Sequence, residues 1–293
     1  MKVGLTLPQG CDREYLGLDP AEIWERTVAI ARLADGAGFD SLWLYDHFQV
    51  DPPLVDAPVL EPFVELAALA THTSRAWLGH LVLAAAYRPA GLTAKMISTL
   101  DVISRGRAVL GIGAGWKEDE WLAYGYGFPP AGERLDILSD HLEVITRMMA
   151  PGRATFVGRH AQVLDAIHEP TAYATPIPIV VGGNGRERTW RLAARFADEL
   201  NLDAMTPDEV RQALPVIRSR SDEIGRDPAT LRVSVHLWGA AMAVADGTQR
   251  QERLLEYAEL GLARVIVQGF PGVQDPAALD ALIRDCGEAG LLG

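Results

Sequence analysis

The sequence predicts a single TIM-type (β/α)₈ barrel of the α/β class. Eight short runs of β-branched and aliphatic residues alternate with longer helical patterns along the 293 residues. Alternation of this kind is typical of parallel strands joined by crossover helices, and eight such units suffice to close a barrel. Barrels of this length occur as one domain, and no linker rich in Pro, Gly or Ser divides the chain. We therefore expect one domain over residues 1–293.

The predicted strands are short, apolar and bounded by turn residues. They cover residues 3–7, 41–45, 77–83, 108–112, 177–181, 199–202, 232–236 and 264–268. Between them, proline just inside the start of a helical pattern and glycine just past its end mark the helix boundaries. These signals predict helix starts at Asp19-Pro20, Thr206-Pro207 and Asp275-Pro276, and helix ends near Gly38 and Gly225.

The connection between the fourth and fifth predicted strands is longer than the others. Residues 131–149 show a helical pattern, and residues 151–176 are expected to contain a hairpin before the next strand. Long insertions often cover a site, so we expect residues of roughly 117–176 to form a lid. The proline-rich stretch 51–62, which follows the second strand, is expected to shape the mouth of the pocket.

Composition and charge argue against several classes of partner. The net charge of −12 would repel a phosphate backbone over most of the surface, so we expect no nucleic-acid partner. The most apolar stretch, residues 76–87, carries His80 and is too short to span a membrane. The chain opens directly into a strand rather than a signal peptide, so we expect a cytoplasmic protein with no membrane partner.

The spacing of cysteines and histidines predicts no metal site. Cys11 and Cys286 lie near opposite ends of the chain, without metal-ligand or redox-motif spacing, and are expected to be free thiols. The histidines show no shared ligand pattern such as H-E-x-x-H.

Residues directly after the strands are the site candidates, because the active site of such a barrel lies at the carboxyl ends of its strands. Polar and glycine residues follow four of the predicted strands, whose ends converge on one face. They are Pro8, Gln9 and Gly10 after the first strand, Asp46, His47 and Phe48 after the second, Gly113, Ala114, Gly115 and Trp116 after the fourth, and Gly182, Gly183, Asn184 and Gly185 after the fifth.

Asp46 and His47 place a carboxylate and an imidazole at a strand end, where a buried site could tune proton transfer. Adjacent strand residues point to opposite faces, so adjacency alone does not make the two a catalytic dyad. The alternative is structural: a carboxylate that caps a loop beside a packed histidine.

The run Gly182, Gly183, Asn184 and Gly185 lies between a strand and an arginine-rich helix. Glycines at such a turn expose backbone N–H groups, and the helix N-terminus adds partial positive charge, so the run is expected to bind a phosphate. A tight turn without a ligand is the alternative reading.

Residues 111–115 contain three glycines, but their spacing and position do not fit a dinucleotide fingerprint. Small residues such as Gly113 and Ala114 would instead let a flat ring lie against the backbone, with Trp116 and Asp119 at its edge. Close packing of the chain against these glycines explains them equally well.

Several stretches together resemble one known family over nearly the whole chain. They are residues 38–43, the Asp46-His47 pair, residues 99–107, residues 111–116 with Glu120, and residues 178–183. This combination resembles the luciferase-like (bacterial luciferase-type) monooxygenase superfamily, and the Asp-His pair resembles its F420-dependent oxidoreductase branch.

The resemblance implies a cofactor ring at the carboxyl ends of the strands, with its phosphate near Gly182 and Gly183. It also implies a backbone bulge with a non-proline cis peptide, which falls at Leu81 and Val82 in this chain. The cofactor implied is coenzyme F420, with FMN as the alternative. By analogy with the family, we expect a homodimer.

The function that follows is hydride transfer between the deazaflavin and a small organic substrate, in the reductive direction. Asp46 or His47 would handle the proton, and Trp116 and Phe48 would flank the substrate. An FMN-dependent monooxygenase is the first alternative, and a flavin-binding barrel without catalysis is the second. Sugar-phosphate dehydrogenases of this family have glutamate and asparagine where this chain has Trp116 and Asp119, which argues against sugar-phosphate oxidation.

Overall fold

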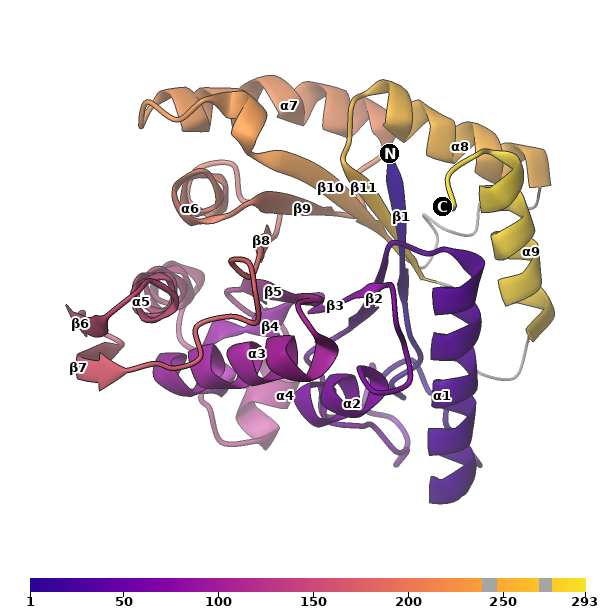
Figure 1. Ribbon diagram of the computed structural model, residues 1–293, viewed down its shortest axis with the longest axis horizontal. Helices are drawn as coiled ribbons and strands as arrows, with labels where there is room; N and C mark the ends of the chain where they lie inside the picture. Colours follow the sequence, from indigo (N-terminus) through magenta and orange to yellow (C-terminus); the bar gives the residue numbers. More distant parts are fainter. Residues whose placement is uncertain (239–246, 269–275) are drawn as a thin grey trace.

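The computed structural model describes residues 1–238, 247–268 and 276–293 and contains a closed parallel barrel. β1 pairs with both β2 and β11, and β3 pairs with β5, so the sheet has no open edge (Figure 1). The predicted (β/α)₈ barrel is therefore confirmed. The barrel strands are β1 (Lys2–Thr6), β2 (Ser41–Leu44), β3 (Trp77–His80), β4 (Leu83–Ala84), β5 (Ala108–Gly113), β8 (Ile179–Gly182), β9 (Glu199–Asp203), β10 (Arg232–Leu237) and β11 (Arg264–Gln268).

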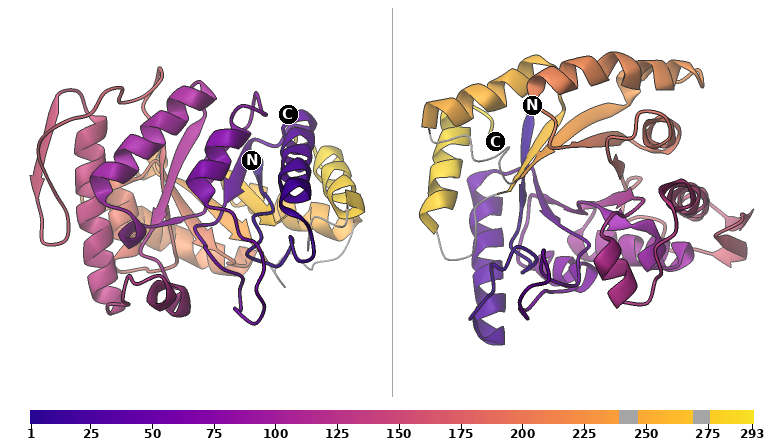
Figure 2. Two further views of the ribbon diagram at one scale, coloured as in Figure 1. Left: turned by 90° about the horizontal axis from the view of Figure 1, so that it is seen from below. Right: turned by 180° about the vertical axis from the view of Figure 1, so that it is seen from behind.

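Helices surround the barrel (Figures 1 and 2). They are α1 (Pro20–Ala37), α2 (Pro62–Leu69), α3 (Ala90–Ser104), α4 (Glu118–Ala123), α5 (Ala131–Met149), α6 (Thr189–Phe196), α7 (Pro207–Asp222), α8 (Gly247–Glu259) and α9 (Pro276–Glu288), with 3₁₀ turns at Ala85–Tyr87 and Pro228–Thr230. Among the described residues, no helix combines the length and apolar character needed to cross a membrane.

Capping interactions stabilise the helix ends that the sequence predicts at Asp19, Thr206 and Gly38. Asp19 and Thr206 each form a capping box with the glutamate three residues later, and Gly38 ends α1 in the left-handed conformation at a φ of 96°. Such caps satisfy backbone groups that the helix itself leaves unpaired. The predicted start at Asp275 lies outside the described residues.

The insertion between β5 and β8 contains α4, α5 and an antiparallel hairpin of β6 (Arg153–Val157) and β7 (Gln162–Ile167). The hairpin packs against α5 and lies at the margin of the molecule, on the far side of α5 from the strands (Figures 1 and 2). It therefore extends the outer layer of the barrel.

The prediction of one strand over residues 77–83 was wrong. The structure divides this segment into β3 and β4, with the expected cis peptide between Leu81 and Val82. Gly111 on the neighbouring strand makes room for the bulge, because a Cβ there would lie 1.8 Å from the carbonyl oxygen of His80. Only glycine allows the two backbones to come this close.

Trp43 fills the interior of the barrel together with Val109, Val180 and Ile266. Two glycines on adjacent strands accept its ring: a Cβ at Gly79 would lie 2.5 Å from the indole, and one at Gly4 would lie 2.8 Å away. The indole Nε1 donates to Ser41 Oγ at 2.9 Å, so the buried polar atom is satisfied.

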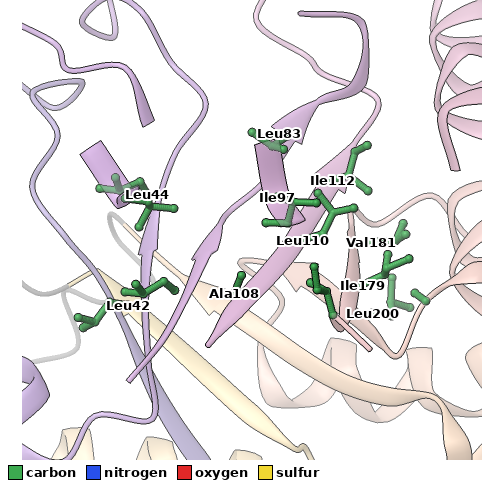
Figure 3. Close-up of a cluster of buried hydrophobic side chains, with 14 of the residues drawn as sticks. Leu42, Leu44, Leu83, Ile97, Ala108, Leu110, Ile112, Ile179, Val181 and Leu200 are labelled. Carbon is green, nitrogen blue, oxygen red and sulfur yellow. The ribbon is translucent and has the colours of Figure 1, made fainter. Parts of the chain in front are cut away.

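A second layer of the core lies between the strands and the helices. Figure 3 shows leucine, isoleucine and valine side chains of β2, β5, β8 and β9 beside Ile97 of α3. This layer follows the alternation of the strands, in which every second side chain faces the helices.

Candidate active site

A cavity of about 450 Å³ opens at the carboxyl ends of the barrel strands. Most of the predicted site residues line this cavity, and they lie at or after the carboxyl ends of β2, β3, β5 and β8. These residues are Asp46, His47, Leu81, Val82, Gly113, Ala114, Trp116, Gly182, Gly183 and Asn184. The structure thus brings together segments that lie far apart in the sequence.

Two predicted cofactor-binding residues, Asp119 and Gly185, do not line the cavity. The Asp119 carboxylate instead accepts from Lys117 Nζ at 3.0 Å and from Gln49 Nε2 at 3.1 Å. A Cβ at Gly185 would lie 2.6 Å from Thr189 Oγ1, so close packing against the start of α6 requires glycine there.

His47 is held by Glu120, which the sequence analysis did not select as a site residue. His47 Nδ1 lies 3.0 Å from Glu120 Oε2, and the same carboxylate accepts from the backbone N–H groups of Phe48 and Gln49 and from the Tyr87 hydroxyl. An ionised carboxylate only accepts, so Nδ1 carries the proton that joins the pair. Within the described residues, Nε2 of this cavity-lining histidine has no hydrogen-bond partner.

Glu120 itself is completely buried. Burial alone would raise its pKa, but the hydrogen bonds from His47, Phe48 and Tyr87 together bring the pKa below its usual value. The carboxylate is therefore ionised at neutral pH and fixes the orientation of the imidazole. Its signal in the sequence was an acidic residue in the first turn of a short helix after β5, and chain position alone could not pair it with His47.

Asp46 is engaged with Arg88. Its two oxygens accept from the guanidinium at 2.9 Å each, and Oδ2 also accepts from Ala84 N–H at 2.8 Å. Burial raises the pKa of Asp46, and the charge of Arg88 opposes that shift. β2 ends at Leu44, so Asp46 and His47 lie in a loop, and strand alternation does not separate them.

Small residues form the wall of the cavity around Val82. A Cβ at Gly113 would lie 2.8 Å from Val82 Cγ2, and one at Gly182 would lie 3.0 Å from both Val82 methyl groups. The glycines of β5 and β8 thus accommodate the bulge that follows β3. The sequence left two interpretations of the glycines near residue 113, room for a flat ring and close packing of the chain. The two are compatible, because the close packing builds one wall of the cavity.

The loop after β8 offers backbone donors. Gly183 N–H is already bound to Asn201 O at 3.0 Å. The Asn184 side chain makes two hydrogen bonds to the backbone of Asp203, which fixes the loop to the end of β9. Within the described residues, the N–H groups of Asn184, Gly185 and Arg186 have no acceptor, so this part of the loop can bind an anion.

Two of the arginines at the following helix form ion pairs with carboxylates at the surface. Arg188 pairs with Asp136, and Arg191 pairs with Glu187 and Glu223. The positive charge predicted near the glycine run is therefore largely neutralised at the surface.

Trp116 lies at the cavity with 64% of its surface exposed, and its ring meets that of His47 edge to face at 5.8 Å. Phe48, which also follows β2, packs instead against Tyr87 and Tyr124 and does not line the cavity. Of Phe48 and Trp116, only Trp116 lines the cavity, where a ligand can contact it.

A second polar cluster at the cavity was missed in the sequence. It consists of Tyr45, Asn201, Asp203, His236 and Trp238, from the ends of β2, β9 and β10. Tyr45 Oη lies 3.0 Å from His236 Nε2, and Trp238 Nε1 donates to Asp203 Oδ1 at 2.8 Å. The available signal was the presence of asparagine and histidine inside otherwise apolar strands.

Cys11, Asp12 and Glu14 bring potential metal-ligand atoms within 4.8 Å of one another. Burial raises the pKa of the Cys11 thiol well above its usual value, which keeps it protonated. Glu14 already accepts from the backbone N–H groups of Gln9 and Asp12.

A barrel whose strand ends carry an oriented histidine, a wall of small residues and a loop with unpaired N–H groups within the described residues has the plan of a cofactor-dependent barrel enzyme. The sequence model of the luciferase-like monooxygenase family matches residues 1–275. The chain therefore belongs to that family.

Two relatives and one solved structure illustrate the likeness. An uncharacterized protein of Mycobacterium tuberculosis is 28% identical over 87% of this chain and 89% of its own length. An F420-dependent glucose-6-phosphate dehydrogenase of Nakamurella multipartita is 30% identical over 90% of this chain and 75% of its own length. An F420-dependent secondary alcohol dehydrogenase, solved with an F420–acetone adduct, superposes with a TM-score of 0.80 at 17% identity over 98% of both chains.

Proposed function

We propose that this chain is an F420-dependent oxidoreductase that transfers a hydride between the deazaflavin and a small organic substrate, in the reductive direction. One observation carries the proposal: the cavity is lined by a histidine whose Nδ1 is fixed by Glu120 and whose Nε2 is unpaired within the described residues. Relatives named for F420 support the choice of cofactor.

The residues present fit a flat cofactor with a phosphate. Val82, Gly113, Ala114 and Gly182 offer a surface without long side chains, against which a planar ring can pack. The unpaired N–H groups that begin at Asn184 would hold the phosphate without a lysine or arginine. When bound, the deazaflavin supplies the carbon that gives or takes the hydride.

The protein supplies position and protons. His47 Nε2 is placed to contact the substrate heteroatom, while Glu120 fixes the orientation of the ring through Nδ1. Asp46 and Arg88 neutralise each other, so their role is to fix the backbone at Ala84 beside the bulge. Trp116 would cover the substrate and exclude water.

A sugar phosphate is not the substrate we propose. Lys117, a cation that lines the cavity, is bound to Asp51 at 2.7 Å and to Asp119 at 3.0 Å, so its charge is already matched. With Trp116 exposed in the cavity as well, the lining suits an uncharged or cationic organic molecule such as a ketone, an imine or an activated alkene.

The test is a parallel titration of the purified protein with F420 and with FMN, followed by fluorescence quenching. Gly113→Ala should weaken binding of the preferred cofactor about tenfold or more, because overpacking against Val82 costs about 1–3 kcal/mol. Gly36→Ala, where an added Cβ has open space, is the matched control. Preference for FMN would favour the monooxygenase, and binding of neither would refute the cofactor assignment.

The homodimer and the cytoplasmic location stay predictions. Sedimentation of the purified protein and fractionation of the source cells test them directly.

A further inference from the structure

Two histidines face the cavity, and each has a carboxylate behind it. His47 lies against Glu120, and His236 of β10 lies with its Nδ1 3.7 Å from Asp203 Oδ1. On its other side, His236 Nε2 lies 3.0 Å from the hydroxyl of Tyr45, which follows β2. Tyr45 and His236 are thus within hydrogen-bond distance at the cavity, and Asp203 lies behind His236 at ion-pair distance.

The two carboxylates differ in their access to water. The Glu120 side chain has no exposed surface and is saturated with hydrogen-bond donors. Asp203 has 53% of its side chain exposed, whereas His236 has 7%. A proton that His47 gives to a substrate can return only through the cavity, but the chain from Tyr45 leads through His236 to a carboxylate in solvent.

We propose that Tyr45 delivers a proton to the substrate and that His236 and Asp203 return it from solvent while the cavity is occupied. This inference rests on the proposed reductive function, which consumes one proton in each turnover. In that function the bound deazaflavin would supply the hydride of the new C–H bond, and the electron pair of the substrate double bond would move to the heteroatom. The heteroatom takes the Tyr45 proton, Tyr45 takes the proton on His236 Nε2, and Nδ1 takes one from water by way of Asp203. Transfer of the ring proton from Nδ1 to Nε2 through water then restores the starting state of His236.

The surroundings of the chain suit this role. Burial raises the pKa of Tyr45 well above its usual value, so the phenol stays protonated until the substrate takes its proton. The charged groups around His236 are Asp203 from β9 and Asp12 from the loop after β1. Neither carboxylate has a lysine or arginine partner within the described residues, so both are left to interact with His236.

The first experiment needs neither cofactor nor substrate. The histidine ring nitrogens of the ligand-free protein are labelled with ¹⁵N, and exchange of the ring protons with water is measured by NMR. His236 should exchange about tenfold or more faster than His141, which is equally buried but lies between backbone carbonyls. Asp203→Asn should remove most of the difference, and Tyr257→Phe, which loses one buried hydroxyl outside the cavity, should leave it unchanged.

The second experiment uses the F420-loaded protein with a panel of ketones, imines and enones. Tyr45→Phe should lower kcat about 100-fold or more with KM and F420 affinity unchanged, and should change the solvent isotope effect, whereas Tyr257→Phe should do neither. Exchange at His236 no faster than at His141, or full kcat in Tyr45→Phe, would overturn the inference. Failure to bind F420 would instead refute the proposed function, since the exchange measurement does not depend on it.

Discussion

The two ends of the barrel differ in how their charged side chains are paired. At the amino-terminal end, Arg264 pairs with both Glu199 and Asp40 and lies over the ring of Trp43. At the carboxyl-terminal end, Asp12 and Asp203 have no lysine or arginine partner within the described residues. The charged groups around Arg264 are matched within the protein. The cavity instead contains both matched pairs, such as Asp46 with Arg88, and carboxylates without a lysine or arginine partner among the described residues.

The largest effect is expected at the oriented histidine. His47→Ala should lower turnover by about 10²–10³-fold, the usual loss when one polar group at the reacting heteroatom is removed, while F420 binds with nearly unchanged affinity. Glu120→Gln should lower it as well, because the imidazole loses the carboxylate that fixes its tautomer. Full turnover in both variants, measured with the best acceptor of the panel, would show that His47 has no role in the reaction. F420 binding without turnover of any acceptor would support the non-catalytic reading.

At the opposite end, Arg264→Ala should destabilise the fold and spare the site. Removal of Arg264 leaves the buried Glu199 with Arg232 at 3.6 Å and the partly buried Asp40 with Lys2 at 2.7 Å, so the cost is at most about 3–5 kcal/mol. Urea unfolding measures the loss, and cofactor titration below the transition should show unchanged affinity. Arg153→Ala breaks an exposed pair with Asp165 and serves as the control, with no loss above about 1 kcal/mol.

Glu65 sharpens the comparison, because it is buried near the start of α2 and both of its carboxyl oxygens lack a hydrogen-bond partner in the described part of the chain. Burial raises its pKa well above the usual value. The folded state therefore favours the protonated carboxyl. Its contribution to the free energy of unfolding is fully present below the ordinary glutamate pKa of about 4.3 and is lost as the pH rises toward the folded-state pKa.

Glu65→Leu should accordingly stabilise the protein at neutral pH by about 1–3 kcal/mol, since an unsatisfied buried polar group is removed. Denaturant midpoints at about pH 5 and pH 8 should differ less in the variant than in the natural protein. A variant that is less stable at both pH values would contradict this prediction and show that the Glu65 carboxyl contributes favourably to the free energy of unfolding.

The smallest effect concerns the loop after β8. Asn184→Ala removes two hydrogen bonds to the Asp203 backbone and should weaken cofactor binding about fivefold, equivalent to about 1 kcal/mol. The melting temperature should hardly change, because the loop is exposed. An unchanged affinity measured by fluorescence quenching would remove the loop from the phosphate site.

The sequence by itself determined the barrel and much of the cavity wall. Alternation of strands and helices is a local signal, and caps such as Asp19 and Thr206 act within one helical turn. The rule that barrel sites lie at the carboxyl ends of strands then selected His47 and Gly182, both of which line the cavity.

Only the tertiary structure decided which groups act together. Glu120 meets His47 across 73 positions of sequence, and Tyr45 meets His236 across 191. The division of the third strand at Leu81 and Val82 likewise depends on Gly111 of the adjacent strand. Pairings of this kind depend on the register and closure of the barrel, and periodicity and capping carry no information about either.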